Sequence, residues 1–167
     1  MTALLYIFKL EDYYKDVFKT VKENLRKNII FVTSNKPAEI LITHLKEEKI
    51  NENRILFIDA VSKYMSINII ERDNIIYVDS PSNLTSLGIL IRGAIENIKG
   101  EKVIIFDSLS TLSLYNEFKI LSRFYNFVIN LSRIKSINTI IFTMETESEK
   151  EVLKDIKGIV DGVKVYE

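Results

Sequence analysis

The sequence predicts an α/β domain in which helices cover both faces of a mostly parallel sheet. Short apolar runs rich in β-branched residues alternate with longer segments of helical spacing. Several of the short runs are apolar throughout, as are parallel strands that are buried on both faces. The 167 residues contain no linker and no low-complexity stretch, so we expect one domain over residues 1–167.

The strand candidates are short apolar runs bounded by polar residues, glycine or proline. IIFV, ILFI and VIIF contain no polar residue at all, which favours positions inside the sheet. In chain order the strands are expected at residues 4–8, 29–32, 55–58, 75–78, 103–106, 139–143 and 163–166.

The helix candidates place apolar residues three and four positions apart, which gives each helix one buried face. Tyr14, Val17, Val21 and Leu25 have this spacing. Pro37 suits the first turn of a helix, where its missing N–H is not needed. In chain order the helices are expected at residues 13–26, 37–48, 84–98 (with Gly100 as the terminating residue), 116–135 and 148–156.

Composition excludes several classes of site. The chain has no cysteine, which rules out disulfides, thiolate chemistry and cysteine-bound zinc. No apolar run reaches the ~20 residues that span a membrane, and the N-terminal residues lack the basic segment of a signal peptide. We therefore expect no membrane contact and a cytoplasmic location. His44, the single histidine, lies between Leu41 and Leu45 on a helix and is expected to pack rather than to catalyse.

Three strand candidates are followed in the same way, by an aspartate and then a serine three residues later. The pairs are Asp59/Ser62, Asp79/Ser82 and Asp107/Ser110. The carboxyl ends of parallel strands meet at one edge of the sheet, where such sheets bind ligands, and carboxylates there suit Mg²⁺. The same residue types also accept N–H bonds in turns and helix caps. The pattern is compatible with both roles.

One segment carries a family resemblance. Residues 102–116, KVIIFDSLSTLSLYN, resemble the Walker B strand of KaiC-like ATPases, whose terminal aspartate contacts Mg²⁺-bound water. The similarity covers about residues 28–167, keeps the element order and is closest to a reduced, archaeal-type group. It implies a RecA-like three-layer α/β/α sandwich, and it makes Asp107 and Ser108 the remnant of a nucleotide site.

The same comparison reveals that the phosphate-binding loop is missing. A Walker A loop needs G-x-x-x-x-G-K-[ST], in which glycines let backbone N–H groups surround the phosphates. Residues 9–16 read KLEDYYKD, with no glycine, the bulky pair Tyr13 and Tyr14, and the acidic residues Glu11 and Asp12. We expect this bulk and this charge to oppose a triphosphate.

A second departure concerns the glutamates that polarise the attacking water in KaiC-like ATPases. The corresponding segment reads TSNKP, with Ser34 and Asn35 in place of carboxylates. Neither side chain acts as a general base near neutral pH. The sequence therefore predicts a RecA/KaiC-like homologue that does not hydrolyse ATP, holds no cofactor, and binds a protein partner or a second copy of itself as an interaction or regulatory module.

Two other functions stay open at this stage. The first is a metal- or small-ligand-binding enzyme or sensor that uses Asp59, Asp79 and Asp107, with Mg²⁺ as the implied cofactor. The second is a nucleic-acid accessory protein related to recombinase paralogues, with the basic cluster in residues 19–27 as its contact. The 23 basic residues are balanced by 23 acidic ones, which argues against a large nucleic-acid footprint.

Overall fold

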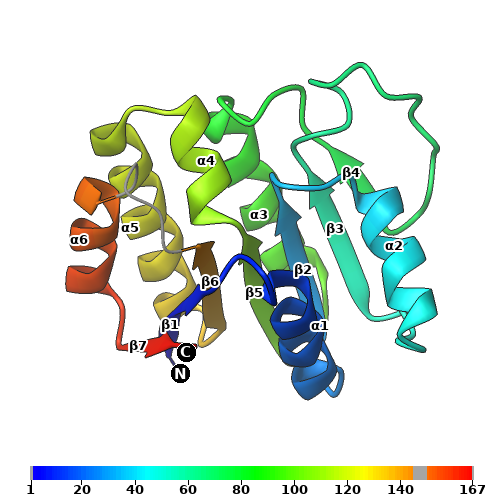
Figure 1. The fold of residues 1–167 in the computed structure, drawn as a ribbon, viewed down its shortest axis with the longest axis horizontal. Helices are drawn as coiled ribbons and strands as arrows, with labels where there is room; N and C mark the ends of the chain where they lie inside the picture. Colours follow the sequence, from blue (N-terminus) through cyan, green and yellow to red (C-terminus); the bar gives the residue numbers. More distant parts are fainter. Residues whose placement is uncertain (1, 145–149, 167) are drawn as a thin grey trace.

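The computed structural model describes residues 2–144 and 150–166 and contains one seven-stranded sheet in the order β4-β3-β2-β5-β6-β1-β7 (Figure 1). Every strand pair is parallel. The strands are β1 (Ala3–Phe8), β2 (Asn28–Thr33), β3 (Ile55–Asp59), β4 (Ile75–Tyr77), β5 (Lys102–Asp107), β6 (Asn138–Met144) and β7 (Gly162–Val165). The predicted α/β class with a parallel sheet is confirmed.

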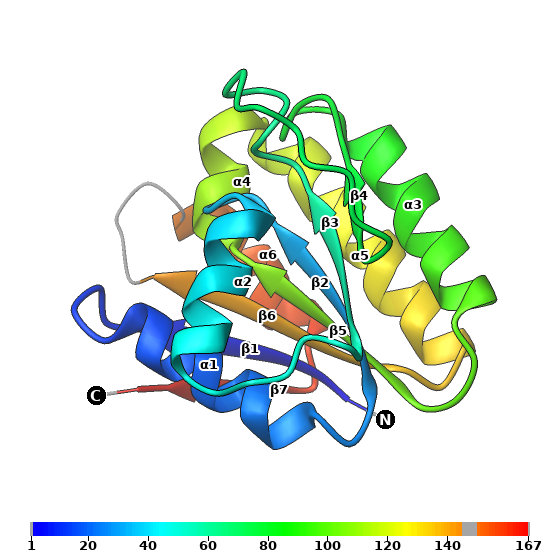
Figure 2. The same ribbon diagram turned by 90° about the vertical axis from the view of Figure 1, so that its right-hand side faces the viewer.

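Helices cover both faces of the sheet and make it the middle of three layers (Figures 1 and 2). The helices are α1 (Tyr13–Asn24), α2 (Ala38–Glu47), α3 (Leu84–Asn97), α4 (Leu109–Tyr115), α5 (Phe118–Ile134) and α6 (Lys150–Ile159). The buried side chains of α1 and α2 form one apolar cluster with the sheet. Those of the other four helices form a second cluster on the opposite face.

Successive side chains along a strand point to opposite faces of the sheet, so each strand contributes residues to both apolar clusters. On β5, Val103 and Ile105 belong to the α1–α2 side, whereas Ile104 and Phe106 belong to the opposite side. All four side chains are fully buried. A strand with two buried faces has to be apolar at every position, which is why VIIF lacks the polar alternation of an exposed sheet.

The region after β5 differs from the sequence-based expectation. Residues 109–115 form the short helix α4, whereas we expected a helix only over residues 116–135. Asn116 separates α4 from α5 with an extended backbone, and its side-chain amide donates to the carbonyls of Leu112 (2.9 Å) and Pro81 (3.1 Å). The first bond satisfies a carbonyl in the last turn of α4, and the second ties this end of α4 to the segment before α3.

The remaining helices follow the expected order with small shifts at their ends. Helix α3 ends at Asn97 with Ile98 as its extended C-cap, so Gly100, expected as the terminating residue, lies two residues beyond the cap, in the left-handed backbone region with φ 82°. The first part of the helix expected at residues 148–156 falls outside the described residues, and α6 is described from Lys150. In residues 2–144 and 150–166, no helix combines the length and apolarity needed to cross a membrane.

Candidate functional site

The candidate site lies at the carboxyl edge of the sheet, between β2 and β5. Asp107 is the last residue of β5 and pairs in register with Thr33, the last residue of β2. From here the sheet extends through β3 to β4 on one side and through β6 on the other. This is the kind of position where open parallel sheets bind ligands. The Asp107 side chain, however, is fully buried.

Two tyrosines at the start of α1 donate hydrogen bonds to the Asp107 carboxylate. The Tyr13 hydroxyl donates a short hydrogen bond to Oδ1, and the Tyr14 hydroxyl donates to Oδ2 at 3.0 Å. Their rings meet edge to face with centroids 5.1 Å apart, and Tyr13 packs against Phe8 at the end of β1. We call Asp107, Tyr13 and Tyr14 the Tyr–Asp cluster. It occupies the position at which the resemblance placed a phosphate loop facing a Walker B aspartate.

The electrostatics of the Tyr–Asp cluster follow from its burial. Loss of solvent raises the pKa of Asp107 from 3.8 to about 6, although hydrogen bonds from Tyr13 and Tyr14, a contact with Asn35 and the charge of Lys36 oppose the rise. Burial and the neighbouring Asp107 charge also raise the pKa of Tyr13 and of Tyr14 above the usual phenol value. Both phenols therefore stay protonated and keep donating at neutral pH.

Hydroxyl side chains hold the backbone around Asp107. The Ser34 N–H donates to the Asp107 carbonyl at 2.7 Å, and the Ser34 hydroxyl lies 2.7 Å from that of Thr111. The Ser108 hydroxyl accepts from the Thr111 N–H at 3.2 Å, and both residues form the capping box of α4. Ser108, expected as a nucleotide-site remnant, is thus buried and bonded to the start of α4.

Asp59 is also buried, but its environment is that of a structural cap. Its Oδ2 accepts from the Ala38 N–H at the start of α2 (2.8 Å) and from the Ser62 hydroxyl (2.7 Å). Its Oδ1 accepts from the N–H groups of Val61 (2.8 Å) and Ser62 (2.9 Å). The bond to Ala38 joins the end of β3 to the first turn of α2, and the other three hold the turn after β3, so the turn and capping role that the sequence left open is the one we observe.

Asp79, the third predicted carboxylate, lies apart from the other two. It follows the edge strand β4, its side chain is 77% exposed, and it pairs with Lys63 at 3.0 Å. Across the described residues, no three carboxylate or histidine side chains are placed to hold a metal ion together. The structure therefore does not gather Asp59, Asp79 and Asp107 into the Mg²⁺ site that the sequence left open.

The acidic residues that were expected to repel a phosphate lie outside the cluster. Glu11 and Asp12 are exposed, and Asp12 lies 3.7 Å from Lys15. The structural obstacle at this edge of the sheet is instead the pair Tyr13 and Tyr14. The bulk of the tyrosines was visible in the sequence, but their hydrogen bonds to Asp107 were not anticipated.

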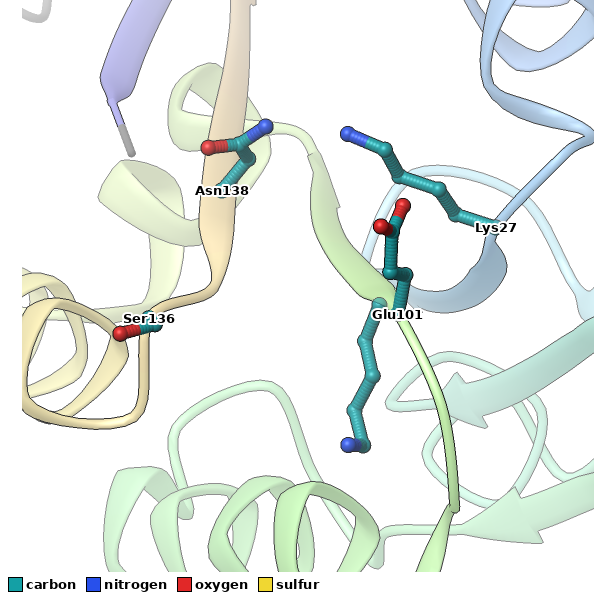
Figure 3. Close-up of a pocket in the computed structure, with 5 residues that line it drawn as sticks. Lys27, Glu101, Ser136 and Asn138 are labelled. Atoms are coloured by element: carbon teal, nitrogen blue, oxygen red, sulfur yellow. The ribbon is translucent and has the colours of Figure 1, made fainter.

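A polar hollow of about 380 Å³ opens at the opposite, amino edge of the sheet, far from Asp107 (Figure 3). Lys27, Glu101, Lys102, Ser136 and Asn138 line it. The Asn138 Oδ1 accepts from the Thr2 N–H at 3.0 Å.

On α1, Lys22 pairs with Glu48 at 3.2 Å. Glu48 thus pairs with Lys22, and Glu101 lines the same hollow as Lys27. The predicted basic cluster is therefore a surface that carries both signs of charge.

Comparison with known proteins gives the fold. No protein-family model matches the chain, and no curated protein matches it. Three similar solved structures come from Pyrococcus horikoshii. The uncharacterised protein PH0321, solved in complex with an unknown peptide, has a TM-score of 0.70 at 14% identity over 96% of this chain and 75% of its own. The KaiC-like protein PH0186 has a TM-score of 0.66 at 16% identity over 98% and 71%.

The third structure, PH0250, has a TM-score of 0.63 at 11% identity over 98% of this chain and 81% of its own. At such identities the likeness concerns the fold alone. The chain thus has a RecA/KaiC-like fold, as the resemblance of residues 102–116 implied.

Proposed function

We propose that this chain is a KaiC-like domain without ATPase activity that acts as a protein-interaction or regulatory module. The observation that carries the proposal is the Tyr–Asp cluster. A Walker B aspartate works by orienting Mg²⁺-bound water beside the phosphates. Here both oxygens of Asp107 already accept phenol hydrogen bonds from inside the domain.

Binding of Mg²⁺-ATP at this edge would require breaking those contacts. Tyr13 is almost fully buried, so a rotation away from Asp107 would leave either an unpaired buried carboxylate or an unpaired buried hydroxyl. The incoming phosphates would then meet a loop without glycine, which cannot wrap them with backbone N–H groups. Ser34 and Asn35 add no general base.

The interaction role is supported by two further facts. The fold is shared with KaiC-like PH0186 and with PH0321, and the latter was solved with a peptide bound. In addition, the described part of this chain exposes a group of large apolar side chains on the loop after β3 and where α4 meets α5. An exposed apolar patch on a folded domain often marks a protein contact.

Isothermal titration calorimetry with ATP and Mg²⁺ tests the catalytic half of the proposal. We expect no saturable heat with the folded chain and no phosphate release above the buffer blank. A micromolar dissociation constant for ATP would overturn it. Asp107→Asn is the matched variant. If ATP binds through the predicted Walker B carboxylate, its affinity should fall in this variant, whereas ATP that binds elsewhere should keep its affinity.

A further inference from the structure

The connection between β3 and β4, residues 60–74, exposes a run of large apolar side chains. Loops of this length without a helix or strand are uncommon in compact domains and are usually functional. Five apolar side chains of the loop leave between 40% and 57% of their surface in water. They are Tyr64, Met65, Ile67, Ile69 and Ile70.

The apolar surface continues onto the end of α4 and the start of α5. The Tyr64 and Tyr115 rings meet edge to face with centroids 5.3 Å apart. Leu114 and Phe118, on either side of Tyr115 in the chain, are also exposed. Figures 1 and 2 show the first part of the loop beyond the carboxyl end of β3, and Figure 1 shows its second part passing beside α2 to the start of β4. We call these eight residues the loop–α4 face.

Hydrogen bonds hold the loop in shape. The Met65 N–H donates to the Val61 carbonyl at 2.9 Å, and the Ile67 N–H donates to that of Ser62 at 3.0 Å. Further along, the Tyr77 hydroxyl donates to the Ile70 carbonyl at 2.8 Å. An apolar surface that is already ordered loses little conformational entropy when a partner covers it.

The end of the loop is tied to α2 by an ion pair. The Arg72 guanidinium binds both carboxylate oxygens of Glu39, with Nη2 3.0 Å from Oε2. A two-point contact fixes the orientation as well as the distance of the two groups. The loop is therefore anchored to β4 through Tyr77 and to α2 through Glu39.

We propose that the loop–α4 face binds the same face of a second copy of this chain, forming a two-fold symmetric dimer. This inference deepens the interaction half of the proposed function. If each side chain has a total area of roughly 200 Å², the face leaves on the order of 700 Å² in water at the observed exposures. A standard interface buries about 800 Å² per partner, so two such faces suffice to cover each other.

Charge makes a second copy a suitable occupant. A two-fold interface pairs a surface with itself, so its rim needs both signs of charge. Lys119 supplies a positive charge next to the apolar residues and Glu71 and Glu117 supply negative ones, whereas Lys63 is paired with Asp79 of the same chain. The chain as a whole carries 23 basic and 23 acidic residues, so two copies do not repel each other through net charge.

Sedimentation velocity of the full chain over a wide concentration range tests the dimer. We expect the mass of two chains, and at least about a tenfold weaker association in the double variant Met65→Glu, Ile70→Glu, because each substitution places a charge in the apolar centre. Ile134→Glu is the matched control. Among the large apolar side chains that the structure describes, Ile134 is the most exposed, at 78%, and it lies at the other end of α5.

Cross-linking tests the symmetry independently, because the chain has no cysteine of its own. In a two-fold interface, residues near the axis approach their own copies. Under mild oxidation, at least one of Tyr64→Cys, Ile67→Cys and Ile70→Cys should form a covalent dimer, whereas Ile134→Cys should stay monomeric. Circular dichroism establishes that each variant is folded.

Three results would overturn the dimer: a monomer at every concentration, a dimer unaffected by the charges in the loop, or cross-linking through Ile134 alone. A monomeric wild type that binds another protein through this face would also overturn it. Calorimetry with ATP separates the two proposals. ATP binding by an intact dimer would overturn the inactive-ATPase proposal only, and a monomer without ATP affinity would overturn the dimer only.

Discussion

Replacing Asp107 with asparagine should change how the stability of the domain depends on pH. Asp107 is a fully buried carboxylate that accepts hydrogen bonds from Tyr13 and Tyr14. Asparagine has nearly the same shape and does not titrate. It retains one acceptor oxygen, and its NH₂ group can donate to the other phenol oxygen. The substitution thus removes the buried charge with little change in packing.

The magnitude follows from the pKa of Asp107, which burial raises from 3.8 to about 6. The folded protein holds this proton more tightly than the unfolded chain. The resulting stability is fully present below about pH 4 and is lost as pH rises through about 6. Each unit of pKa corresponds to about 1.4 kcal/mol, so the carboxyl contributes a change on the order of 3 kcal/mol across that window.

Urea denaturation of the wild type and of Asp107→Asn at several values between about pH 4 and pH 7 measures this change. The other carboxyl groups are common to both proteins, so the difference between their free energies of unfolding isolates Asp107. We expect that difference to move in favour of the variant by about 3 kcal/mol as pH rises. Tyr14→Phe, which keeps the carboxyl but removes a hydrogen bond that lowers its pKa, should show a pH dependence of the same sign as the wild type and of greater size. A difference that stays constant over the whole range would refute the reasoning.

Three further predictions concern individual residues and can be measured by urea denaturation at neutral pH. Tyr13→Phe should cost about 1–3 kcal/mol, because it leaves a buried carboxylate oxygen without its donor, and Tyr14→Phe should cost less, because Tyr14 is only half-buried. Equal costs would contradict this ranking. Asp59→Asn should cost about 3 kcal/mol, because its NH₂ group would face N–H donors, whereas exposed Asp79→Asn should stay within about 0.5 kcal/mol. Gly100→Ala should cost about 1 kcal/mol through its backbone at φ 82°, since the added Cβ comes no closer than 3.7 Å to its nearest neighbour, the Asn28 side chain; no loss of stability would contradict the backbone argument.

The order of strands and helices could be predicted because both periodicities are strong in this sequence. Runs such as VIIF have to be buried on both faces, and only a covered parallel sheet buries them in that way. The short helix α4 was missed because Ser and Thr residues, which favour turns and caps, make up much of LSTLSLY. Ser108, a residue type that favours the N-cap position, directly after the strand was a usable signal.

The site was predictable only in part, because strand position in the sheet is not a local property. Asp59 and Asp79 follow their strands in the same local pattern. Asp59 ends the interior strand β3 and is buried, whereas Asp79 follows the edge strand β4 and is exposed. Likewise, Tyr13 and Asp107 are 94 residues apart, and only the folded arrangement of α1 and β5 brings them together.

The Tyr–Asp cluster also constrains how this domain could change by mutation. Replacing Tyr13 or Tyr14 with glycine, as a phosphate loop would need, removes a donor from Asp107 before any ligand replaces it. Replacing Asp107 first removes the residue that a Mg²⁺ ion would need. Every single-step path toward a nucleotide site therefore passes through a less stable or less capable intermediate. A nucleotide site at this position would therefore require several substitutions at once.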